Sequence, residues 1–178
     1  AYMLSGELAT KLTARYIEID MLPLSFSEYS EMVDIYDKRK RFNLYMNLGA
    51  FPYPARFTDN TLAHNQYLEG IYNTVLVKDV LTRKKLNDVT LVKSIATFLC
   101  DSIGSPVSAK KIADTLTSSG RPTGVATVEL YLEALTDSYL FYKVQRYDIK
   151  GKMHLKSESK YYICDTGLRN MILGVTNR

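Results

Sequence analysis

The chain has 178 residues and a net charge of +4, so it can bury a core of its own without disulfide or metal staples. Its two cysteines form no spaced motif and its two histidines lie far apart, which excludes a disulfide framework and a clustered zinc site. No apolar run approaches the ~20 residues of a membrane span and no signal peptide opens the chain, so we expect a cytoplasmic protein without a membrane partner.

The first forty residues predict short helices around one strand. We expect a helix from Leu4 to Leu12, and the alternating, β-branched pattern of Arg15–Ile19 predicts a strand. Ser25 and Glu28 have the spacing of a capping box, which predicts a helix that begins there and continues to about Ile35.

Two further helices are expected before residue 87. The charged run Asp37–Arg41 is either a phosphate-contacting segment or a solvated helix face. A helix from Arg41 to Leu48 should end at the break Gly49–Pro52. The segment Thr61–Leu86 predicts one long helix, because its apolar residues recur at steps of three and four. The expected buried stripe consists of Leu62, Leu68, Ile71, Val75, Leu76, Val80 and Leu81.

The chain from residue 88 has the element order of a winged helix, namely three helices followed by two strands. We expect a helix capped by Asp88 or Thr90, a helix capped by Ser108, a third helix at about Thr123–Asp137, and strands at Tyr139–Arg146 and Lys160–Cys164. The third helix should bury Val125, Val128, Leu132 and Leu135.

Positive charge is concentrated at the end of the chain, where residues 141–178 carry eight lysines and arginines against three acidic residues. A DNA-bound winged helix places its third helix in the major groove and a basic wing over the phosphates. The candidate DNA contacts are Lys143, Arg146, Lys150, Lys152 and Lys156 on the wing and Arg121 before the third helix. That helix, however, directs Glu129 and Glu133 outward, where they would repel phosphates. The alternative is a protein-packing module with a basic hairpin.

The sequence contains no catalytic motif. The phosphate-binding patterns G-x-x-x-x-G-K-[ST] and G-x-G-x-x-G are absent, and so is the nucleophile motif G-x-S-x-G. We therefore expect no catalytic residue, no metal site and no bound cofactor in this chain alone.

Six stretches, in order along nearly the whole chain, carry a resemblance: Leu4–Leu8, Leu12–Ile19, Leu22–Tyr29, Gly49–Pro52, Val75–Val80 and Lys160–Arg169. Together they are similar to AAA+-like P-loop ATPases of bacteria and archaea, which carry a nuclease-like C-terminal domain of unknown function. Ala1 is not an initiator methionine, and the first residues already resemble the inside of a fold. We therefore expect a segment of a longer protein.

The resemblance implies that the phosphate loop, the magnesium-binding strand and a sensor asparagine precede Ala1, so that ATP and Mg²⁺ belong to the intact parent protein. It implies four regions: 1–30 as the end of the ATPase core, 31–87 as a helical lid or connector, 88–164 as the winged helix, and 165–178 as the start of the C-terminal domain. Arg15 matches a family arginine suited to a γ-phosphate, although Ala14 replaces the family's glycine. An arginine paired with Glu18 or Asp20 is the alternative.

We therefore expect a mainly α-helical fold with a small β component, in which ATPase lid helices precede a winged helix-turn-helix domain. The expected role is a nucleotide-dependent relay to double-stranded DNA or to a protein partner. A DNA-binding winged-helix regulator and a protein–protein adaptor are the alternatives. Duplex binding with a steep salt dependence would favour the regulator, and a salt-insensitive protein complex would favour the adaptor.

Overall fold

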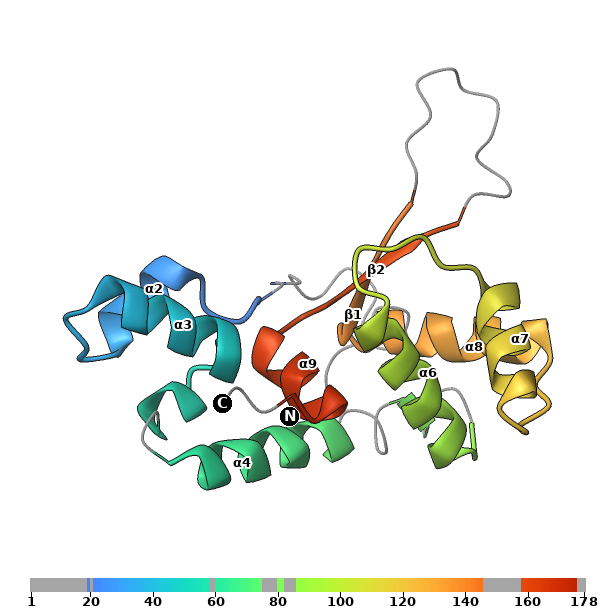
Figure 1. Ribbon diagram of the computed structural model, residues 1–178, viewed down its shortest axis with the longest axis horizontal. Coiled ribbons are helices and arrows are strands. Elements are labelled where there is room, and N and C mark those ends of the chain that lie inside the picture. Colours follow the sequence, from blue (N-terminus) through green and yellow to red (C-terminus); the bar gives the residue numbers. More distant parts are fainter. Residues whose placement is uncertain are drawn as a thin grey trace, which may run out of the picture. The chain divides into compact units, whose positions relative to one another are not determined.

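The computed structural model describes residues 19, 21–57, 60–74, 80–81, 86–145 and 158–175. Within these residues the fold is mainly helical, with seven α-helices, one 3-10 helix and one two-stranded antiparallel sheet (Figure 1). The expected mainly helical class with a small β component is thus confirmed. The helix predicted at Leu4–Leu12 lies outside the described residues, as does all of the predicted strand Arg15–Ile19 except its last residue.

The described residues form two compact units. The first unit combines the part up to Thr74 with the part from Cys164 onward, and the second unit runs from Val75 to Ile163. In sequence, the second unit is therefore an insertion between two parts of the first.

The first unit is built from short helices. They are α2 (Phe26–Met32), α3 (Lys38–Leu48), the 3-10 helix η1 (Pro54–Phe57), α4 (Thr61–Asn73) and α9 (Thr166–Leu173). The C-terminal helix α9 packs against both α3 and α4, as Figure 1 shows. A small core of Tyr29, Val33 and Ala55 lies between α2 and η1, with Tyr45 of α3 packed on it.

Capping side chains fix where α2 and α3 begin. The capping box of Ser25 and Glu28 is present, as predicted. Helix α2 ends at Met32 rather than near Ile35, because the next residue is already extended. Helix α3 begins three residues earlier than predicted, because the Asp37 carboxylate accepts hydrogen bonds from two backbone N–H groups of the following turn. The charged run therefore forms the first turn of α3.

Part of the long helix predicted at Thr61–Leu86 is described. Helix α4 begins after Asn60, whose side chain accepts the N–H of Ala63 at 3.0 Å. Leu68 is buried as expected, but Leu62 is 70% exposed, so its place in the buried stripe was wrong. Leu62 lies two residues before the buried His64, about 200° around the helix, and so faces solvent. Residues 75–79 and 82–85 lie outside the description.

A buried carboxylate joins α9 to the end of α3. Asp165 is 4% exposed, and its carboxylate accepts the backbone N–H of Ala50 at 2.6 Å and that of Leu168 at 2.8 Å. It therefore caps α9 and binds the segment after α3 with the same group. We call this pair of hydrogen bonds the Asp165 clasp.

Two glycines make the Asp165 clasp possible. Gly49, the C-cap of α3, has a φ of 88°, and a side chain there would also collide with the Asp165 carboxylate. A side chain at Gly167 would collide with the backbone carbonyl of Leu48. The end of α3 and the start of α9 therefore approach so closely that neither position 49 nor position 167 has room for a Cβ atom.

Two further contacts fix the segment Leu48–Ala50 at the end of α3. The His64 imidazole contacts the Leu48 carbonyl at 2.6 Å, and since a carbonyl only accepts, the Nε2 of His64 carries the proton. The N–H of Leu24 donates to the Ala50 carbonyl at 2.9 Å. Burial lowers the pKa of His64 and raises the pKa of Asp165, the latter partly offset by the N–H groups donated to its carboxylate.

The second unit contains three helices and the sheet. They are α6 (Val89–Asp101), α7 (Ala109–Ser118), α8 (Val125–Asp137), β1 (Phe141–Val144) and β2 (Lys160–Ile163). The two strands pair with Phe141 opposite Ile163, and Val107, between α6 and α7, bridges Ser159 just before β2. The core of the unit is formed by buried side chains of all three helices together with Phe141 and Tyr161.

The predicted helix starts and inward residues of this unit are mostly confirmed. Asp88, not Thr90, caps α6, and Ser108 caps α7. Val128, Leu132 and Leu135 are buried.

Three details of the prediction were wrong. Val125 is 41% exposed, because it is the first residue of α8 and points away from the core. The first strand begins at Phe141, because Tyr139 has a φ of 57° that no strand adopts. The second strand ends at Ile163, one residue earlier than expected.

We expect Gly167→Ala to lower the free energy of unfolding by about 2 kcal/mol or more, because the added methyl group cannot fit against the Leu48 backbone. Gly70→Ala is the matched control, since Gly70 lies inside α4 with nothing within 4 Å of an added Cβ. That variant should gain up to about 1 kcal/mol from helix propensity. Urea unfolding measures both, and equal effects of the two variants would contradict the close approach of α3 and α9.

The buried His64 should make stability depend on pH. The pKa of His64 is lower in the folded chain than in the unfolded chain, so His64 binds a proton more readily when the chain is unfolded. The free energy of unfolding should therefore fall as the pH drops through and below 6.5. Asp165 acts oppositely, since a raised pKa gives stability at low pH that is lost as the pH rises. His64→Gln keeps an N–H for the Leu48 carbonyl but cannot titrate. Urea unfolding between pH 7 and 5 should show a smaller loss for this variant, and an unchanged loss would contradict the role of His64.

Candidate functional site

The outward face of α8 is acidic and apolar. Its exposed residues Ala126, Glu129, Leu130, Glu133 and Asp137 lie within about 100° of the helix surface. Leu130 is 48% exposed, and no lysine or arginine occurs anywhere in α8. A helix with this face would bring negative charge towards the phosphates on both sides of a DNA groove. The same face suits a protein surface that offers apolar and cationic side chains.

Arg121, a predicted DNA contact, holds α6 and α8 together. Its guanidinium binds both carboxylate oxygens of Asp88, and Asp88 also accepts the N–H of Leu91 as the cap of α6. The N–H of Asp88 donates to the hydroxyl of Tyr131 on α8 at 3.3 Å. The hydrogen bonds from Arg121 are the main reason that the pKa of Asp88 is lowered. Both hydrogen bonds come from one guanidinium nitrogen, Nη2, so other donors of Arg121 remain, but the Asp88 carboxylate offsets the positive charge that Arg121 would offer to a phosphate.

The described residues bring few of the predicted site residues together. Lys143 is exposed on β1 and makes no ion pair with a described residue. The other wing candidates Arg146, Lys150, Lys152 and Lys156 lie outside the described residues, and so does the nucleotide candidate Arg15. Their roles stay predictions.

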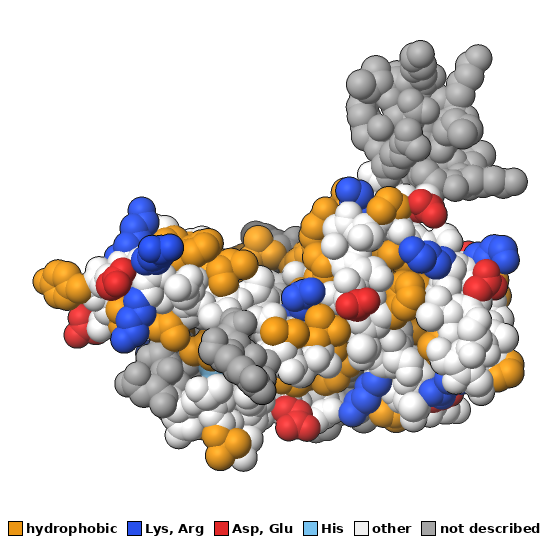
Figure 2. Space-filling view, in the orientation of Figure 1, with side chains coloured by type: hydrophobic (Ala, Val, Ile, Leu, Met, Phe, Trp, Pro, Cys, Tyr) orange, Lys and Arg blue, Asp and Glu red, His pale blue; other side chains and the backbone are white. Residues whose placement is uncertain are grey.

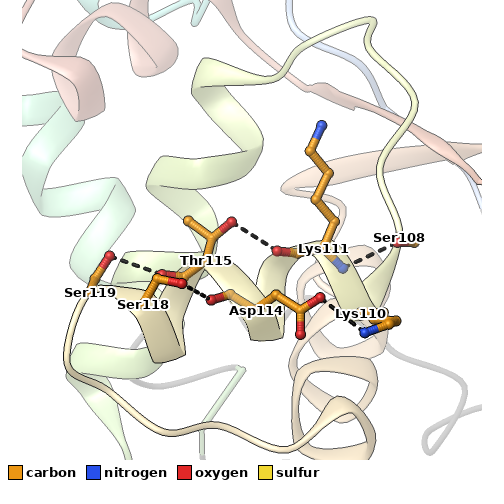
Figure 3. Close-up of a pocket in the computed structure, with 7 residues that line it drawn as sticks. All are labelled: Ser108, Lys110, Lys111, Asp114, Thr115, Ser118 and Ser119. Carbon is orange, nitrogen blue, oxygen red and sulfur yellow. Dashed lines mark hydrogen bonds and ion pairs between the residues drawn. The ribbon is translucent and has the colours of Figure 1, made fainter.

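A surface hollow of about 520 Å³ lies along α7 (Figure 3). Its seven lining residues are Ser108, Lys110, Lys111, Asp114, Thr115, Ser118 and Ser119. The hydroxyls of Thr115, Ser118 and Ser119 donate to helix carbonyls one turn earlier, and Lys110 pairs with Asp114 at 3.1 Å. Lys111 extends away from these groups. Lys111 is the one cation of this lining that makes no ion pair with a described residue, and the hollow has the character of a solvated helix face rather than a phosphate site.

The first unit carries a second exposed helix face, on α3. Lys38, Arg39 and Lys40 are exposed in its first turn, and Figure 2 shows lysine and arginine side chains gathered over this part of the chain. Phe42 and Met46 follow on α3 and are 46% and 41% exposed. The outward face of α3 is therefore cationic at its start and apolar towards its end.

The described residues offer no metal centre, since no three of their His, Cys, Asp or Glu side chains are grouped to hold an ion. None of the described helices is both long and apolar enough to cross a membrane.

Sequence reasoning missed the two polar contacts that organise the units. Asp88 and Arg121 are 33 residues apart, and no local pattern pairs them. Asp165 could have been identified as a helix cap, because it precedes an apolar helical stretch. Its second bond, to Ala50, joins residues 115 apart in sequence.

Residues 39–178 match a family described as a domain of unknown function, DUF8612. An uncharacterised protein of Haemophilus influenzae is 40% identical over 98% of this chain and 44% of its own length. An uncharacterised protein of Methanocaldococcus jannaschii is 27% identical over 96% of this chain and 40% of its own length. The chain thus spans less than half of each relative. No solved structure matches it.

Reversing the charge of α8 should create duplex affinity if its outward face approaches DNA. The variant Glu129→Lys/Glu133→Lys should bind a labelled random duplex more tightly than the unchanged chain, with a salt dependence steeper by about two phosphate contacts. Fluorescence anisotropy at low and near-physiological salt measures this. Glu31→Lys/Glu69→Lys makes the same charge change at exposed positions of the first unit. An equal gain from this control would mean that net charge alone, and not α8, sets duplex affinity.

Proposed function

The chain belongs to the DUF8612 family, and we propose that it is the relay region of an AAA+-type ATPase. In this proposal the first unit contains lid helices that respond to nucleotide in a core outside this chain. The second unit is a winged helix that passes the response to a protein partner through α8. This chain alone binds no nucleotide, because ATP and Mg²⁺ belong to the core.

The observation that carries the choice of a protein partner is the chemistry of α8. Its outward face presents the carboxylates of Glu129, Glu133 and Asp137 beside the exposed Leu130. A recognition helix in a major groove needs donors for base edges and cations near phosphates. Exposed carboxylates and a leucine fit a protein surface better, since leucine gains from burial and the carboxylates can pair with cations.

The arrangement of the second unit supports a winged helix. Three helices precede an antiparallel pair of strands, and Val107, between the first two helices, adds a bridge at Ser159. A small sheet beside a helix-turn-helix is the arrangement that defines this class of domain. Function does not follow from such a fold by itself, so the partner is argued from the side chains of α8.

The lid assignment rests on the six stretches that resemble AAA+-like ATPases and on the length of the relatives. More than half of the Haemophilus influenzae protein lies outside the stretch aligned with this chain. A nucleotide-binding core of ordinary domain size fits in a segment of that kind.

Double-stranded DNA is the second candidate partner, because cationic residues are concentrated from Lys143 to Lys156. If DNA is the partner, the unchanged chain binds a random duplex with a steep salt dependence, and Lys150→Glu/Lys152→Glu abolishes that binding. This result would mean that the partner of the second unit is DNA and not a protein.

The intact Haemophilus influenzae relative tests the relay. We expect a G-x-x-x-x-G-K-[ST] motif about 90–110 residues before the stretch that aligns with Leu4–Leu8. A non-hydrolysable ATP analogue and ADP should then give different protease cleavage patterns in the region that aligns with the residues after Leu86. Replacing the motif lysine by alanine should remove the difference. An absent motif would refute the ATPase assignment, and identical patterns would refute the relay.

A further inference from the structure

We infer that α8 docks in antiparallel orientation on α3 of a second copy of this chain. The inference rests on the proposed function, because it names the partner of the same α8 face. It uses the two faces described above, one acidic and apolar on the second unit and one cationic and apolar on the first.

The two faces are complementary along their length. On the outward face of α8, Ala126 and Leu130 come first, with Glu129 beside them, and the carboxylates of Glu133 and Asp137 come last. On α3 the order is reversed, since the cations come first and the apolar side chains last. They are Lys38 and Arg39, followed by Phe42 and Met46. Antiparallel docking therefore places carboxylates against cations and apolar side chains against apolar side chains.

The spacing of the residues suits two helices side by side. On α3, Arg39, Phe42 and Met46 follow steps of three and four, and on α8 Ala126, Leu130, Glu133 and Asp137 follow steps of four, three and four. Such steps form a stripe along one helix face, which is what a packed helix pair requires. At 1.5 Å per residue, Lys38–Met46 spans about 12 Å and Val125–Asp137 about 18 Å, so the shorter stripe fits within the longer one.

The charges oppose the dipoles of their own helices. Cations occupy the first turn of α3, where the cap Asp37 supplies the favourable negative charge, and carboxylates occupy the last turns of α8. In an isolated chain both arrangements are slightly unfavourable. Antiparallel docking offsets them, because each charged end then lies beside the opposite charge.

Carboxylates near α3 limit the electrostatic attraction between its cations and the carboxylates of α8. Asp37 is occupied as the cap of α3, and Glu31 and Asp34 are exposed on the preceding segment. These carboxylates weaken the positive field around Lys38 and Arg39. The affinity should therefore depend on the apolar pairs as well as the charges, and it should fall only moderately with salt.

The two faces are different, so each chain offers one face to the next copy. Two chains that exchange these faces reciprocally close as a two-fold dimer, whereas one-way docking along a series of chains produces rings or open chains. In either case the average mass should rise with protein concentration to at least that of a dimer.

Sedimentation velocity over a range of concentrations tests the docking. Arg39→Glu and Glu133→Arg should each weaken self-association roughly fivefold. An equimolar mixture of the two variants should restore it, because each reversed face then meets an oppositely reversed one. Lys93→Glu and Glu69→Lys change exposed charges outside both faces and should leave the mass unchanged. Glu133 also interacts within its own chain, so circular dichroism must show that the variants are folded.

A chain that stays monomeric at all concentrations, or variants that are not restored by mixing, would overturn the docking. The same results leave the proposed protein relay standing if duplex binding is weak. Strong, salt-steep duplex binding by the unchanged chain would instead overturn the proposed function itself.

Discussion

The first unit depends on one buried carboxylate that has no cation beside it among the described residues. Asp165 accepts the backbone N–H of Leu168 in α9 and that of Ala50, which follows α3 and lies 115 residues earlier in the sequence. Placing a charge in a protein interior is costly unless strong donors replace the lost water. The donors here are fixed parts of the backbone, so the carboxylate holds α9 in a single orientation against the end of α3. The glycines at positions 49 and 167 are needed because a side chain at Gly49 would collide with the Asp165 carboxylate and one at Gly167 would collide with the Leu48 backbone.

The second unit is organised by an ion pair at its edge instead of a carboxylate in its core. Asp88 caps α6 and at the same time receives the guanidinium of Arg121, which lies just before α8. This pair is partly exposed, so its own stabilisation is modest and the buried apolar side chains of the three helices supply most of the stability. Its main effect is geometric, since it sets the start of α6 against the turn that leads into α8.

The parts of this structure that could be predicted are those fixed by short-range chemistry. Ser25 and Ser108 were recognised as caps, and Asp88 as one of two candidates beside Thr90, because a cap acts over three residues. Errors arose where the orientation of a single side chain decided the outcome, since Leu62 faces solvent on the side of α4 away from His64 and Val125 is the first residue of α8. The Asp165 clasp could not be found in this way, because its partner at Ala50 is remote in sequence. The acidic face of α8 was anticipated from Glu129 and Glu133, and a solvated helix face was one of the two readings of Asp37–Arg41. The exposure of Leu130 and the start of α3 at Lys38 required the structure.

The insertion of the second unit into the first has a consequence for how a broken chain behaves. The first unit is made of two separate pieces of polypeptide, and the Asp165 clasp binds them without a covalent bond. A single cut anywhere in the second unit would therefore separate the chain into two fragments on a denaturing gel. Under native conditions α9 would remain bound to α3 and α4, and the nicked protein would still migrate as one species. The cut would be detected only after unfolding, when the hydrogen bonds of Asp165 are broken and the two fragments separate.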